Sequence, residues 1–130
     1  MASIFELENP AFGNQYRKTT VTTLAASGAQ TATAAMLLGG VLVSTATAAF
    51  NLTTDTGALI CAALETVGQN VIGISFTFSI VNLGTSTFHV TLVAGATGAT
   101  VSGDAIVEAG TSSTFRAVVT AANTVVIYSV

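Results

Sequence analysis

The chain has 130 residues, of which 7% are charged and 51% are hydrophobic, and its formal net charge is −3. Ordinary globular domains carry about 25% charged residues, so the surface of this protein must consist mainly of Thr, Ser, Ala and Gly. Three basic residues are too few to neutralise a run of phosphates, which argues against nucleic-acid binding. Weakly charged surfaces repel their own copies little, so we expect a structural protein that packs against neighbouring molecules.

Residues 1–18 differ in composition from everything that follows them. They contain Pro10, the only proline of the chain, and three aromatic residues, but show no sustained periodicity. Disordered tails are usually poor in aromatic residues, so we expect an extended arm that docks on a partner. The sequence thus divides into this arm and a single domain at residues 19–130. The arm residues predicted to bind the partner are Phe5, Phe12, Tyr16, Arg17 and Lys18.

From residue 19 onward, small turn-forming residues interrupt the chain about every 8–12 residues, a spacing typical of an all-β sandwich or barrel. The first strands are predicted at 19–24, 31–38, 41–45 and 50–53. Residues 31–50 are uncharged and long enough to span a membrane. Their Thr and Ser content, the central Gly39-Gly40 pair and the lack of a basic anchor disfavour a membrane helix. We therefore expect two strands joined at the glycine pair, and no membrane partner.

Residues 56–66 have the periodicity of a helix. Their large apolar residues recur at helical spacing, and either Asp55 or Thr56 can accept hydrogen bonds from the first turn. Gly68 is expected to end the segment, because glycine commonly follows the last helical turn. The sequence predicts one short helix in an otherwise β protein.

The clearest strands lie at 74–82 and 87–93 and are predicted to form a hairpin at the centre of the core. In the first of them Phe76, Phe78 and Ile80 alternate with polar residues, as in a strand with one buried face. Further strands are predicted at 100–102, 105–109, 114–120 and 125–130. The pattern predicts a mainly β fold, namely a small antiparallel β-barrel or sandwich of jelly-roll type.

The last strand is apolar on both faces. Val125 and Ile127 point one way, and the residues that point the other way are Val126, Tyr128 and Val130. A strand with two apolar faces is covered on both sides, so we expect the second face to contact another subunit. Arg116, the only basic residue after Lys18, is assigned to the same subunit interface or to an ion pair with Glu108.

The sequence contains no recognisable catalytic pattern. His89 is the only histidine, and Cys61 is the only cysteine and lies in an apolar run typical of a buried position. A metal site needs three or four ligands and a catalytic triad needs a base beside its nucleophile, and neither can be assembled here. We expect no catalytic, cofactor-binding or metal-binding residues, and no enzymatic activity.

From Phe50 to the end of the chain, the order of elements follows a recognisable series. The segments are FNLTTDTG, ALICAALE, VGQNVIGISFTFSIVN, FHVTLVAGATGATVSG, IVEAGTSSTFRAVVT and TVVIYSV. This series resembles a family of small β-rich structural proteins of tailed phages and other large DNA viruses. The resemblance covers about 80 residues and implies a module found in capsid decoration (cement) proteins and in fibre or spike components, often as trimers.

These observations lead to one expected function and to alternatives. We expect a capsid decoration protein on the capsid surface of a virion, bound to the major capsid protein and assembled as a homotrimer. A fibre, spike or adhesin knob that binds a host receptor or glycan is the main alternative. A threonine-rich ice-binding surface is a weaker one, because the Thr-x-Thr pairs are unevenly spaced.

Overall fold

The computed structural model describes residues 18–130, in which strands predominate over two short helices, as the sequence predicts. Of the predicted arm residues, Phe5, Phe12, Tyr16 and Arg17 lie outside the described residues. The elements in chain order are β1 (Thr20–Thr23), β2 (Gln30–Ala32), α1 (Ala34–Gly39), β3 (Gly40–Ser44), β4 (Phe50–Thr54), α2 (Gly57–Glu65), β5 (Ser75–Asn82), β6 (Val90–Val93), β7 (Ala99–Ser102), β8 (Ile106–Val107), β9 (Thr111–Ala121) and β10 (Thr124–Ser129).

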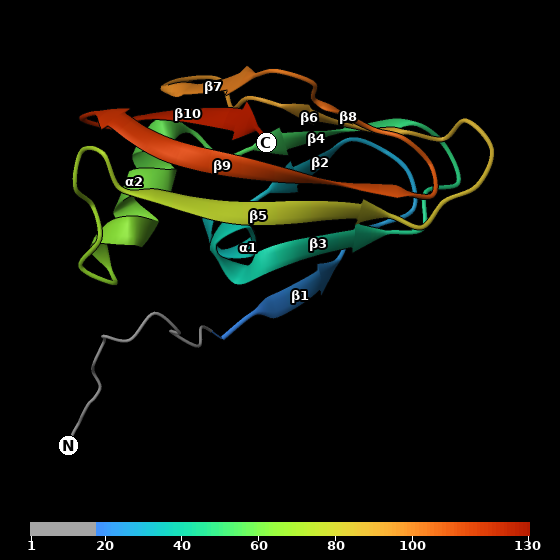
Figure 1. Cartoon of the computed structure of the whole chain (residues 1–130), viewed down its shortest axis with the longest axis horizontal. Helices are drawn as coiled ribbons and strands as arrows, with labels where there is room; N and C mark the ends of the chain where they lie inside the picture. Colours follow the sequence, from blue (N-terminus) through green and yellow to red (C-terminus); the bar gives the residue numbers. More distant parts are fainter. Residues whose placement is uncertain (1–17) are drawn as a thin grey trace.

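Two mixed sheets face each other across the core (Figure 1). The larger sheet has the order β1-β3-β5-β9-β10-β7 and the smaller one the order β2-β4-β6-β8. Successive strands from β1 to β6 alternate between the sheets, so the chain winds in coils that each give one strand to each sheet. Within residues 18–130 neither sheet closes into a barrel, because β1, β7, β2 and β8 are edge strands.

The antiparallel pairing expected from the sequence is wrong for most of the structure. Strands of successive coils pair in parallel, β1 with β3 and β3 with β5 in one sheet, and β2 with β4 and β4 with β6 in the other. Strand β7 is also parallel to β10. Antiparallel pairs occur where β9 joins β5 and β10, and where β8 joins β6. The winding of the chain explains this result, because a strand that returns after a full coil runs in the same direction.

The hairpin expected between residues 74–82 and 87–93 is also wrong, because β5 and β6 belong to different sheets. The buried side chain of Asn82, at the end of β5, stabilises the crossing. Its Nδ2 donates to the carbonyl oxygens of Phe88 (2.8 Å) and Val107 (3.1 Å), and its Oδ1 accepts from the Gly84 amide (2.9 Å). One side chain thus ties together β5, the crossing loop and β8.

Helix α1 occupies a segment in which a strand was expected. The Thr33 hydroxyl accepts a hydrogen bond from the Met36 amide (3.3 Å), and the Asp55 carboxylate accepts one from the Ala34 amide (2.8 Å). The residues between this cap and the glycine pair are Ala, Met and Leu, which are strong helix formers. Gly40 then ends the helix with a φ of 104°, a left-handed conformation that favours glycine.

Helix α2 confirms the one helix that the sequence predicts. Thr56 caps its start by accepting from the Leu59 amide (3.3 Å), and Gly68, with a φ of 70°, follows its end. In the part of the chain that the structure covers, neither helix is long and apolar enough to cross a membrane.

A three-residue sequence recurs at the corner that follows β2, β4 and β6. The corners read Thr33-Ala34-Ala35, Thr56-Gly57-Ala58 and Thr97-Gly98-Ala99. They stack closely, because the Gly57 amide donates to the Thr97 carbonyl oxygen (2.9 Å). A Cβ atom on Gly57 would overlap the carbonyl oxygens of Gly98 and Asn123, so only glycine fits at that corner.

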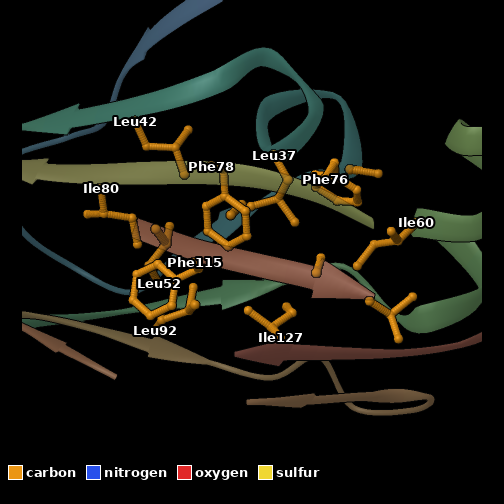
Figure 2. Packing of buried hydrophobic residues seen from close by; sticks show 14 of the residues in the cluster. Leu37, Leu42, Leu52, Ile60, Phe76, Phe78, Ile80, Leu92, Phe115 and Ile127 are labelled. Carbon is orange, nitrogen blue, oxygen red and sulfur yellow. The ribbon is translucent and has the colours of Figure 1, made fainter. Parts of the chain in front are cut away.

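The space between the sheets is filled by large apolar side chains. Phe78 of β5 and Phe115 of β9 stack with their ring centroids 5.4 Å apart. Figure 2 shows Leu52 and Leu92 of the smaller sheet on the opposite side of this layer. The inward positions predicted for residues 74–82, 114–120 and 125–130 are confirmed, since the buried residues of these strands include Phe76, Phe78, Ile80, Phe115, Ala117, Val119, Val125 and Ile127.

Replacing Phe78 by Ala is expected to cost about 3–5 kcal/mol of unfolding free energy, because the cavity lies at the centre of the aromatic stack. Chemical denaturation measures this loss. Val81→Ala removes methyl groups from the outward side of the same strand and is the control, with an expected loss below about 1.5 kcal/mol. A Phe78→Ala loss below about 1 kcal/mol would show that the inward assignment of β5 is wrong.

Replacing Asn82 by Ala is expected to cost about 3 kcal/mol, because the two carbonyl oxygens and the amide that it binds would lose their partners inside the protein. The matched control is Asn51→Ala on the exposed face of β4, for which we expect a change within about 0.5 kcal/mol. Equal losses for the two variants in a denaturation series would contradict the structural role of Asn82.

Candidate interaction surface

The larger sheet has an outward face that no other element between residues 18 and 130 covers. Its members lie between the buried residues of each strand, because side chains alternate across a sheet. We call this set the outer sheet face: Val21, Thr23, Val41, Val43, Ser75, Thr77, Ser79, Val81, Thr114, Arg116, Val118, Val126, Tyr128, Val130, Thr100 and Ser102.

The strand register places these residues in rows that cross the sheet. One row contains Thr77, Arg116 and Tyr128, with Arg116 directly opposite both of its neighbours. In the row on one side of it Val126 lies opposite Val118, and in the row on the other side the Val130 amide donates to the Thr114 carbonyl oxygen (3.0 Å). The structure therefore brings the four predicted interface residues, Arg116, Val126, Tyr128 and Val130, to one surface.

The outer sheet face is apolar and nearly free of charge. Val21, Tyr128 and Val130 have exposed fractions of 60%, 42% and 67%. Valine, serine and threonine make up most of the face, and Arg116 is its one charged member. The centres of protein interfaces are likewise depleted in charge and enriched in Tyr and Arg.

Arg116 and Glu108, the ion pair considered from the sequence, are not brought together. The Thr111 amide donates to the Glu108 carbonyl oxygen (3.1 Å), so Glu108 lies at the start of β9. Arg116 lies five residues beyond Thr111, the first residue of β9. This separation corresponds to about 17 Å at a rise of about 3.3 Å per residue. The register neighbours of Arg116 are instead Thr77 and Tyr128.

Lys18 lies at the β1 edge of the outer sheet face. It lines a shallow pocket of about 170 Å³ with Thr19, Leu38, Gly39, Gly40, Val41 and Thr77. Thr77 is the register neighbour of Arg116, so the pocket adjoins the row that contains this second cation. Lys18 is the one predicted arm residue that the structure describes.

The other sequence candidates have structural positions. Cys61 is buried in α2, as predicted. The Oδ1 atom of Asp104 accepts from the Ile106 amide (3.0 Å), which confirms its role in a turn. His89 is half-buried before β6, and its carbonyl oxygen accepts from the Phe50 amide (3.2 Å). Among residues 18–130, no three His, Cys, Asp or Glu side chains are grouped so that they could hold a metal ion.

Four further exposed apolar side chains were not predicted from the sequence. They are Leu59 on α2 and Val67, Val71 and Ile72 in the loop that leads to β5. Figure 1 shows this loop beside α2, at the end of the sheets opposite the loop between β5 and β6. The sequence signal was weak, because Val71 and Ile72 are adjacent and follow no strand or helix period.

Searches against known proteins add no relationship to these observations. No protein-family model matches the chain, and neither curated proteins nor solved structures give a significant match.

Proposed function

We propose that this protein is a capsid decoration protein, which binds the major capsid protein on the surface of a virion and stabilises the lattice through surface packing. The outer sheet face is the observation that carries the proposal, because it offers a surface on which the subunits pack, while the arm is the segment assigned to the major capsid protein. A broad flat surface of valine and short hydroxyl side chains, with Tyr128 and Arg116 at its centre, has the composition of a protein-binding surface. The resemblance of residues 50–130 to viral structural modules supports the proposed location on a virion.

The size of the outer sheet face suits a protein that binds in many copies. Six strands about 4.8 Å apart span about 24 Å, and the paired parts of the strands are about 20 Å long. The resulting area of about 500 Å² is smaller than the roughly 800 Å² that each partner contributes to a standard interface. A single contact of this kind is weak, and an oligomer strengthens capsid binding because its linked subunits engage several lattice sites at once.

A fibre, spike or adhesin knob that binds a glycan or receptor is the second candidate. Such sites combine polar groups with aromatic side chains in a concave surface. Among residues 18–130, those that line the shallow pocket beside Lys18 include no aromatic residue, which favours the decoration role over a glycan site.

Replacing Tyr128 by Ala is expected to weaken binding to capsid shells about tenfold or more, because exposed Tyr residues at interface centres stabilise subunit packing and separated subunits engage fewer lattice sites. The probe is a shell assembled from the major capsid protein of the same genome, and cosedimentation measures binding. Val67→Ala truncates an exposed side chain away from the outer sheet face and should bind like the wild type. Failure of the wild-type protein to bind shells would overturn the proposed function.

The arm stays a prediction from the sequence, and its test is a deletion. Removing residues 1–17 is expected to abolish shell binding, while the circular dichroism spectrum and melting temperature of residues 18–130 stay those of a folded β domain. A truncated protein that binds shells as tightly as the full chain would contradict the role of the arm.

A further inference from the structure

The charged side chains of residues 18–130 are separated by sign. The two cations, Lys18 and Arg116, both lie at the outer sheet face, one at its β1 edge and one on β9. The carboxylates lie elsewhere. Asp55 caps α1, and Glu65 ends α2.

The remaining two carboxylates flank β8, the edge strand of the smaller sheet. Exposure alternates along this segment, because Asp104, Ile106 and Glu108 are exposed while Val107 between them is fully buried. Ile106 has an exposed fraction of 41% and lies between the two acids. We call these three outward-facing residues the β8 strip.

The spacing of the two charge pairs is similar. Asp104 and Glu108 are four residues apart in an extended segment, which corresponds to about 13 Å. Three strand spacings separate Lys18, beside β1, from Arg116 on β9, which corresponds to about 14 Å. Apolar or short side chains lie between the charges in both cases. The β8 strip is thus complementary to the outer sheet face in charge, spacing and apolar centre.

The two surfaces lie on opposite sides of the molecule. Lys18 precedes β1 at one edge of the larger sheet, and Asp104 follows β7 at the other edge. A Cβ on Gly103, the residue before Asp104, would lie 3.1 Å from the Ser129 side chain of β10, which fixes the turn against this second edge. One molecule therefore cannot bring its own two surfaces into contact, whereas two molecules placed side by side can.

We propose, on the basis of the proposed function, that a second copy of this chain occupies the outer sheet face through its β8 strip. The contact is head-to-tail, with the carboxylates of Asp104 and Glu108 facing Lys18 and Arg116 of the next copy, and Ile106 against the valine surface. A symmetric face-to-face contact would instead place cations against cations. A head-to-tail contact leaves a free surface on each copy, so it repeats until the copies close into a ring.

Charge reversal tests this contact in the absence of capsid shells. One variant carries Lys18→Glu and Arg116→Glu, and the other carries Asp104→Lys and Glu108→Lys. Each variant alone places like charges in the contact, so its self-association should weaken about tenfold or more relative to the wild type. In an equimolar mixture every contact between unlike copies again joins opposite charges. Association into complexes with an even number of copies should then recover to within about threefold of the wild type, whereas a three-membered ring cannot alternate the two variants and keeps one contact between like charges.

Sedimentation velocity and light scattering provide the measurement, with circular dichroism to show that the variants fold. Glu65→Lys reverses a carboxylate outside both surfaces and should associate like the wild type. The proposal is overturned if the wild type stays a monomer at high concentration, if the variants associate normally, or if the mixture fails to recover. Because no shells are present, these outcomes are independent of the test of capsid binding.

Discussion

Parallel pairing between successive coils requires the chain to change sheets after each strand from β1 to β6, and the remaining structure depends on this crossing. Each crossing needs a corner that brings backbone atoms close together. After β2, β4 and β6 the stacked Thr-x-Ala corners make this close approach, and Gly57 lies against the Gly98 and Asn123 carbonyl groups. At the crossing between β5 and β6, the Asn82 side chain stabilises the approach by binding three backbone groups.

This winding leaves the outer sheet face without a cover from residues 18–130. Both helices lie where the chain crosses from the smaller sheet to the larger one, so neither packs on the outward side of the six strands (Figure 1). The sequence fills that side with valine, serine and threonine, with Arg116 as its one charge. The hydroxyl groups keep such a surface hydrated in the free protein. Covering it favours binding of a partner, since apolar burial stabilises association by about 25 cal/mol per Å² before the entropic costs of binding.

The in-out assignment of β5, β9 and β10 follows from the sequence because alternation of apolar and polar residues depends only on the strand itself. The direction of pairing does not, since alternation is the same in parallel and antiparallel sheets. Helix α1 was missed because its alanine and leucine residues also suit a buried strand, although the Thr33 cap marks its start. The proximity of Arg116 to Tyr128 requires the register of β9 and β10, and the β8 strip requires the fold of a two-residue strand.

The claim that the outer sheet face is buried on assembly is tested most directly by hydroxyl-radical footprinting of Tyr128. Its ring is exposed in the single chain, whereas Met36 of α1, which packs against the core, reports on a region that assembly leaves unchanged. We expect the oxidation rate of Tyr128 to fall several-fold between dilute protein and the assembled or capsid-bound state, while the rate at Met36 stays constant. The same rate at Tyr128 in both states would contradict the account.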